Sequence, residues 1–238
     1  MLVTKEHFRS FLERRGALLL LCSIIAVTIA SPVADSHPRA GAVLTFMVLL
    51  AIGLGASFRR NKRKVVYIVA PLSFLWLVAR LLEEVGNGHH FYNHLAHVIG
   101  LFLSCTLLWA MSHRLRETSD VTGSVLAEAF VSYLIIAIAF SQLYWVLNEL
   151  VPSPFNVPIP PTQGATFLYF SMMTLSCAGY GEIVPVNVYL RILAALESMT
   201  GIFYVAIVVA RLVSSYPRRR RGAYSRRTDP GGVTPPVV

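Results

Sequence analysis

Long apolar stretches separated by short polar loops dominate the hydrophobic pattern of this chain. A helix needs about 20 mainly apolar residues to cross a bilayer. Stretches close to or above that length occupy residues 16–33, 40–58, 65–82, 91–111, 124–150 and 187–214. The pattern therefore predicts an all-α membrane protein with six transmembrane helices.

A shorter helical pattern, residues 162–175, precedes the last of these stretches. About a dozen residues are too few to span a bilayer, but they suit a helix that enters the membrane and turns back. The proline-rich segment 151–161 separates it from the fifth stretch and cannot continue a helix. A glycine-containing turn, residues 176–182, follows it. We expect a re-entrant helix and loop at this point.

The charges add an orientation to this pattern. Of the 238 residues, 55% are hydrophobic and 14% are charged, and the net charge is +9. All lysines and arginines except Arg39, Arg80 and Arg191 fall on the N-terminal segment, on the second and fourth connections, or near the C-terminal end. Positive residues mark cytoplasmic segments, so we expect both termini to lie in the cytoplasm. We expect a multi-pass protein of the cell membrane, in a prokaryotic plasma membrane. We interpret the charge as a topology signal rather than a nucleic-acid surface.

The pattern divides the chain into five parts. We expect a cytoplasmic N-terminal segment (1–15), a four-helix transmembrane domain (16–115), a cytoplasmic linker (116–123), a second transmembrane domain that holds the re-entrant segment (124–215), and a basic, disordered cytoplasmic tail (216–238). The tail's run Arg218, Arg219, Arg220 and Arg221 suits contact with anionic lipids.

No group of residues predicts an enzyme. The sequence shows no paired carboxylates, no nucleophile beside a base and no phosphate-binding glycine loop. Its three cysteines do not have the spacing of a disulfide framework or a zinc site. We therefore expect neither catalysis nor an organic cofactor.

The turn after the short helix carries the most specific motif. It reads Cys177-Ala178-Gly179-Tyr180-Gly181, then Glu182 and, three residues later, Pro185. Glycine adopts the left-handed backbone angles that turn successive carbonyls the same way. Carbonyl oxygens aimed at one axis replace the water shell of a dehydrated cation. Over residues 125–214 the chain resembles the potassium-channel pore family, whose filter reads Thr-Val-Gly-Tyr-Gly-Asp.

The resemblance implies a homotetramer in which four chains surround one pore. It makes residues 124–215 a pore domain of outer helix, pore helix, filter and inner helix. It implies K⁺ ions held by the main-chain oxygens of Cys177, Ala178, Gly179 and Tyr180, with Gly181 closing the filter. The resemblance and the composition of the flanking helices also suggest supporting residues. We expect filter support from Ser176, Glu182, Tyr169, Phe170 and Glu197, and an inner-helix hinge or gate at Gly201, Ile202, Val205 and Val209. For Glu197 we expect a serine or threonine partner on the short helix, because ionisable groups within membranes face protein or water.

Two departures from the family motif leave the selectivity open. Cys177 stands where the family has threonine, and a thiol is a poor ligand for a hard cation. Ala178 stands where the family has valine. The first alternative is thus a weakly selective monovalent cation channel on the same scaffold. A six-span transporter is the second alternative, although the chain shows no repeated halves.

Two features of the fourth predicted span bear on gating. A voltage sensor needs arginines along its fourth helix, and residues 91–111 contain none. We expect gating that is not voltage-driven. The cluster His89, His90, His94 and His97 is a candidate for pH or metal sensing, or a set of residues at the membrane interface.

Overall fold

The computed structural model describes residues 21–22, 24–26, 28–32, 35–37, 41, 43, 63–85, 90–117, 123–160 and 162–214. The predictions for the N-terminal segment 1–15 and the tail 216–238 lie outside the described residues. So do most of the predicted second span, 40–58, the residue His89, and positions 118–122 of the predicted linker.

Within the described ranges every regular element is a helix. The named helices are α3 (Arg63–Val85), α4 (His90–Glu117), α5 (Gly123–Leu150), α6 (Gly164–Leu175) and α7 (Val188–Ser214). The described residues of the predicted first span are also helical. The remaining pairing is one isolated antiparallel bridge between Phe155 and Pro185. The all-α prediction is therefore confirmed for the described part of the chain.

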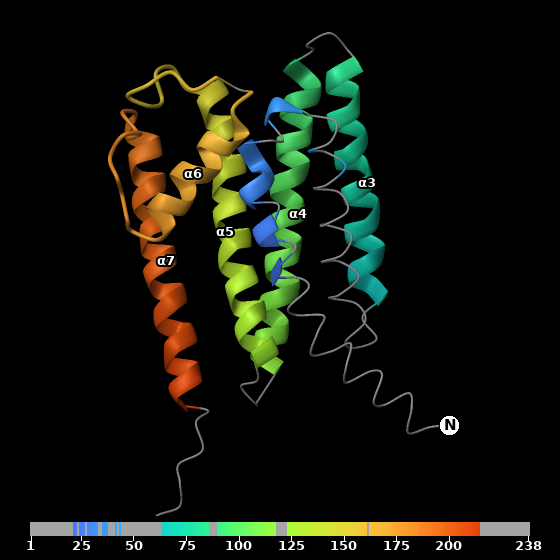
Figure 1. Ribbon diagram of the computed structural model, residues 1–238, viewed down its shortest axis with the longest axis vertical. Helices are drawn as coiled ribbons and strands as arrows, with labels where there is room; N and C mark the ends of the chain where they lie inside the picture. The colour runs from blue at the N-terminus through green and yellow to red at the C-terminus, as the bar shows by residue number, and fades with distance from the viewer. Residues whose placement is uncertain are drawn as a thin grey trace, which may run out of the picture.

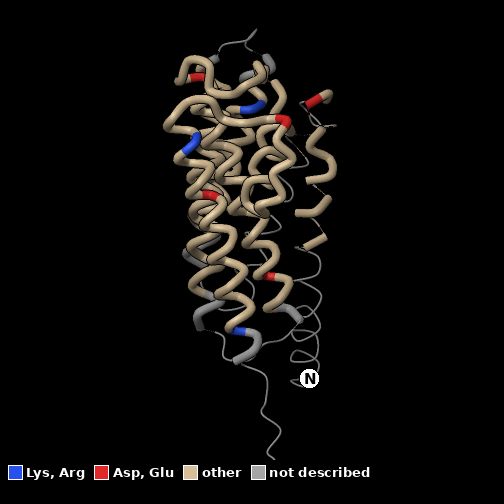
Figure 2. Tube along the Cα trace, turned by 90° about the vertical axis from the view of Figure 1, so that its left-hand side faces the viewer, with Lys and Arg blue, Asp and Glu red and all other residues tan. Residues whose placement is uncertain are grey.

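Three described helices are long and apolar enough to cross a membrane. They comprise Phe91–His113, Val125–Leu150 and Val188–Arg211. The predicted span 65–82 is helical throughout, and its described apolar part is Tyr67–Leu82. Figure 2 shows few charged residues along the middle of the helices. The count of six spans stays a prediction.

The helices form a row, α3 beside α4 beside α5, with α6 and α7 on the far side of α5 (Figure 1). Apolar side chains of α3, α4 and α5 build one core cluster that includes Val69, Leu103 and Val131. A second, aromatic cluster joins α5, the loop after it, α6 and α7. Its fully or nearly fully buried members include Tyr144, Trp145, Phe155, Phe167 and Phe170. This second cluster packs α6 against the proline-rich loop.

Helix α7 differs from the others in how little of it the chain itself covers. Only 11% of its apolar window is buried, against 44% for α4 and 50% for α5. Large side chains such as Ile202, Val205 and Val209 are at least half exposed. Apolar surface of this extent is stable only against lipid or another protein surface.

Candidate functional site

In the turn after α6, the backbone angle φ alternates between positive and negative values from one residue to the next. Positive φ angles occur at Cys177 (57°), Gly179 (49°) and Gly181 (83°), while Ala178 and Tyr180 between them do not have one. Positive φ is unusual for a residue with a side chain, so the value at Cys177 is a local strain that its surroundings must stabilise. A strict alternation of this kind keeps an extended segment from pairing as an ordinary strand.

The backbone N–H groups at the start of this turn fold back onto α6. Ala178 and Gly179 both donate to the carbonyl of Met173, at 3.0 and 3.3 Å. In contrast, no hydrogen-bond donor among the described residues reaches the carbonyl oxygens of the five residues from Cys177 to Gly181, all of which are exposed. Unpaired carbonyls require an outside partner, which is water or a bound cation.

The C-terminal end of α6 is fully hydrogen-bonded within the protein. An α-helix leaves its last four carbonyls without helical partners. Here Ser176 N donates to Met172 O and Cys177 N to Thr174 O, both at 3.1 Å. The Leu175 carbonyl accepts from the Tyr133 hydroxyl of α5, also at 3.1 Å. The Ser176 side chain adds a bond to Met172 O at 2.7 Å. This end of α6 is held by α5 and by the turn it precedes.

The N-terminal end of α6 is capped from far away in the sequence. Gln163 stands at the N-cap position but its side chain makes no capping bond. Instead the carboxylate of Asp35 accepts a hydrogen bond from Ala165 N at 3.0 Å. Burial raises the pKa of Asp35, while this bond and the nearby Arg80 act in the opposite direction.

The segment after the turn is clamped to the proline-rich loop. Asn156 donates from its side chain to Glu182 O at 3.0 Å and accepts from Val184 N at 2.8 Å. The Tyr169 hydroxyl of α6 donates to the Glu182 carboxylate. That hydrogen bond, with a smaller contribution from burial, raises the pKa of Tyr169 to about 12. Glu182 is therefore held through both its backbone and its side chain.

Glu197 of α7 is completely buried behind α6. Its carboxylate accepts a bond from the Tyr144 hydroxyl of α5 at 2.8 Å and contacts the Ser171 hydroxyl of α6. The expected contact with a serine of the short helix is thus present. Ser171 also donates to Ala137 O at 2.8 Å. One acidic side chain joins the three helices around the turn.

At Gly201 the backbone of α7 lies directly against the backbone of α6. A Cβ atom added there would stand 1.9 Å from the carbonyl oxygen of Leu175. Further along α7, the side chains of Ile202, Val205 and Val209 are at least half exposed. The structure brings the expected hinge glycine to the filter end of α6 and leaves the expected gate residues on an open face.

The aromatic residues expected to brace the filter separate into two groups. Phe170 is buried against the rings of Tyr144 and Phe155, at centroid distances of 4.9 and 5.2 Å. Tyr180 is 75% exposed. Phe170 therefore supports α6 from its inner side, and Tyr169 is the α6 aromatic residue that contacts the filter segment, through Glu182.

The histidines do not form a metal site in the described residues, where no group of three or more possible metal ligands occurs. His97 stacks on Trp145 with ring centroids 3.7 Å apart, and His94 meets the same ring at 5.3 Å. His97 also bonds to the side chain of Gln142. Two of the candidate sensing residues are thus built into the contact between α4 and α5; the side chain of His90 is not described.

Sequence reasoning missed several residues of this site. They are Tyr133 and Tyr144 on α5, Asn156 in the loop, Ser198 on α7 and the distant cap Asp35. Tyrosines inside an apolar helix do carry a signal, because a buried hydroxyl seeks a hydrogen-bond partner. The Asp35 contact has no local signal.

Comparison with known proteins agrees with this geometry. Residues 128–216 match the family described as ion channel. The chain is also 29% identical over 123 residues to protein LctB of Bacillus caldotenax. That match covers 49% of this chain and 89% of the relative.

Proposed function

Because residues 128–216 belong to the ion channel family, we propose that the protein is a potassium-selective channel with Cys177–Gly181 as its filter. The observation that carries this proposal is a row of five carbonyls, on exposed residues, that no hydrogen-bond donor in the described part of the chain reaches, on a backbone whose φ alternates in sign. Such carbonyls suit the ligation of a dehydrated monovalent cation.

Four chains around one axis would complete the pore. K⁺ would occupy layers formed by the carbonyls of Cys177, Ala178, Gly179 and Tyr180, each layer with one oxygen from every subunit. The open face of α7 supports assembly, because Ile202, Val205 and Val209 need a cover that the described part of the chain does not provide. In the tetramer these side chains line an apolar inner cavity, and lipid covers the outer surface.

A weakly selective cation channel is the second candidate, and the geometry of Cys177 favours it. Its sulfur points to the carbonyl of Ser198 on α7, at 3.8 Å, and its φ is positive. A threonine hydroxyl would offer a hard oxygen ligand at this level; a thiol does not. Loss of the innermost site lowers discrimination between K⁺ and Na⁺ while the upper carbonyl layers continue to conduct.

Gating in this proposal does not depend on voltage. The transmembrane part of α4 carries no arginine between Phe91 and His113 that could move through the field. We place the protein in the cell membrane with both termini in the cytoplasm. There the tail arginines 218–221 meet anionic headgroups.

A reversal potential tests the proposal. The purified protein is placed in a planar bilayer with K⁺ on one side and Na⁺ on the other. A value near the K⁺ equilibrium potential supports the selective channel, and a value near zero with robust current supports the weakly selective one. Gly179→Ala is the control, because current that survives it does not pass through this filter. Absence of current in the native protein would contradict both candidates.

A further inference from the structure

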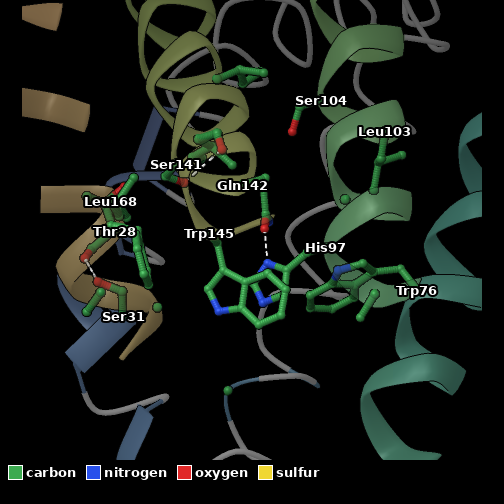
Figure 3. A pocket seen from close by; sticks show the side chains of 18 of the residues that line it. Thr28, Ser31, Trp76, His97, Leu103, Ser104, Ser141, Gln142, Trp145 and Leu168 are labelled. Carbon is green, nitrogen blue, oxygen red and sulfur yellow. Dashed lines mark hydrogen bonds between the residues drawn. The ribbon is translucent and has the colours of Figure 1, made fainter. Parts of the chain in front are cut away.

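A cavity of about 190 Å³ lies away from the filter, among α3, α4, α5, the start of α6 and the helical residues near Thr28. Figure 3 shows side chains from α4 and α5, among them His97, Ser104 and Gln142, around this space. Neither the filter nor the proposed ion path uses it.

The walls of the cavity are mainly apolar and aromatic. Trp76 of α3 and Trp145 of α5 form two sides, and His97 stacks on the second ring. Aliphatic side chains of α4 and α5, such as Leu107 and Ile135, close the deeper part. Flat rings and branched aliphatic groups favour a ligand with an aromatic body.

One hydroxyl in this wall, that of Ser104, has no partner among the described residues. The Ser104 side chain is 6% exposed, and its hydroxyl makes no hydrogen bond with any described residue. Other hydroxyls on the apolar helices do have a backbone acceptor. Ser73 donates to Val69 O at 2.7 Å, and Thr106 donates to Phe102 O at 2.8 Å. A buried hydroxyl without a partner costs about 1–3 kcal/mol, so Ser104 suits a hydrogen-bonding guest.

Gly100 and Gln142 shape the space next to Ser104. A Cβ on Gly100 would stand 2.9 Å from the side-chain nitrogen of Gln142, so only glycine leaves that amide its place. The Gln142 oxygen is bonded to His97. Its NH₂ group is therefore the second polar group that a guest can meet here.

The charged residues that line the cavity indicate a neutral ligand. Asp35 and Arg80 both line the cavity, and the positive charge of Arg80 acts to lower the pKa of Asp35. Because these opposite charges balance, a charged ligand would gain no uncompensated partner while losing its hydration. The volume of the cavity, about 190 Å³, also suits a ligand with one ring, because a dry protein cavity of about 150 Å³ holds benzene.

We propose that this cavity binds a small, neutral, one-ring aromatic molecule with a single hydrogen-bonding group, of the phenol class. Its ring lies between Trp76 and Trp145, and its hydroxyl meets Ser104. Gly164, Ala165 and Leu168 of α6 also line the cavity. Where the proposed function holds, occupancy therefore changes conduction through the helix that precedes the filter.

Tryptophan fluorescence tests binding directly. The chain has three tryptophans, of which Trp109 is 62% exposed and outside the cavity. In a Trp109→Phe background, the full-length protein in nanodiscs reports only from Trp76 and Trp145. The probe is 4-bromophenol, whose bromine quenches nearby indoles, and 4-bromotoluene is its analogue without a hydroxyl.

We expect saturable quenching by 4-bromophenol at lower concentration than by 4-bromotoluene. Ser104→Ala should weaken 4-bromophenol about fivefold and leave 4-bromotoluene unchanged, because it removes one hydrogen bond. Ser104→Leu should abolish saturable quenching by filling the space. Cys105→Leu, which alters an exposed position next to it, is the matched control and should bind normally.

Two results would overturn the proposal. Quenching that rises linearly with probe and is equal in all variants means partition into lipid and a cavity that holds only water. Equal affinity for the two probes in the native cavity excludes the hydrogen-bonding ligand class. Ser104→Ala removes one oxygen atom and is the decisive variant if Ser104→Leu does not fold. These results do not depend on current, so binding and channel function can fail separately.

Discussion

Gly201 of α7 lies against the main chain of Leu175 of α6, where a methyl carbon would stand 1.9 Å from the Leu175 carbonyl oxygen. The same oxygen accepts a hydrogen bond from Tyr133 of α5. The last residue of α6 is thus fixed from two helices at once. Glycine is needed here for close packing, whether or not α7 also bends at this position.

Gly201→Ala should destabilise the protein in spite of the better helix propensity of alanine. Alanine gains about 1 kcal/mol in a helix interior. The contact it makes is with backbone, which cannot rotate away, and overpacking of this kind typically costs about 1–3 kcal/mol. We expect a lower melting temperature of the detergent-purified protein. Gly164→Ala is the control, since its Cβ meets nothing nearer than Asp35 Oδ1 at 3.4 Å. If the Gly201→Ala protein were as stable as the native one, close packing would not explain this glycine, and a hinge role alone would remain.

Glu197→Gln should be tolerated better than Glu197→Ala. Ser171 has one proton and two acceptors within reach, Ala137 O and Glu197. A glutamine amide can donate to Ser171 while its oxygen accepts from Tyr144. Alanine instead leaves the buried Tyr144 hydroxyl without this partner, at a cost of about 1–3 kcal/mol, while Ser171 keeps its bond to Ala137 O. Thermal unfolding of the two variants measures the difference. Glu149→Gln, on a half-buried position of α5, controls for the change of charge. Equal melting temperatures for the two Glu197 variants would mean that the hydrogen bonds of this side chain do not stabilise the fold.

Gly181→Ala should stop conduction without preventing assembly. Its φ is +83°, and no atom lies within 4 Å of an added Cβ, so the penalty is conformational. An L-residue in a left-handed conformation costs roughly 1–2 kcal/mol. Four copies of that cost fall on one filter in the proposed tetramer. Bilayer currents and gel filtration together measure the effect. Ala178→Gly is the matched control, because Ala178 has no positive φ. Normal currents in Gly181→Ala would mean that this segment is not the conducting one.

The contact between Tyr169 and Glu182 should give the outer end of the filter segment an alkaline pH dependence. Tyr169 donates this hydrogen bond only when protonated, and its pKa is raised from 10.0 to about 12. Because the folded pKa is the higher one, the stabilising contribution is complete below pH 10 and is lost as the pH rises through 12. We expect thermal stability to fall over this range and Tyr169→Phe to flatten that fall. Tyr189→Phe, which changes an exposed tyrosine elsewhere, should not.

The sequence allowed the pore half of the fold to be predicted closely. The ends of α5, α6 and α7 lie within two residues of the predicted boundaries, because the prolines of 151–161 and the glycines after Leu175 interrupt the helical pattern. The partner class of Glu197 was also predictable, since a carboxylate buried between apolar helices needs a hydroxyl or amide donor.

Contacts between distant segments were not predictable in the same way. Hydrophobic period assigns a residue to a helix face but not to a particular neighbour. The sequence therefore indicates Phe170 as filter support without indicating that its ring packs against Tyr144 and Phe155. The positive φ of Cys177 had no signal either, because glycine is the residue expected at such an angle.

The cap on α6 has a consequence for the order of synthesis. Asp35 and Ala165, joined by one hydrogen bond, are 130 positions apart in the chain. A ribosome makes the carboxylate well before the helix that it completes. The short helix cannot reach its native N-terminal geometry by local folding as it leaves the translocation machinery. It must find a segment that was inserted several helices earlier. Maturation of the conducting segment is thereby tied to correct insertion of the first part of the polypeptide.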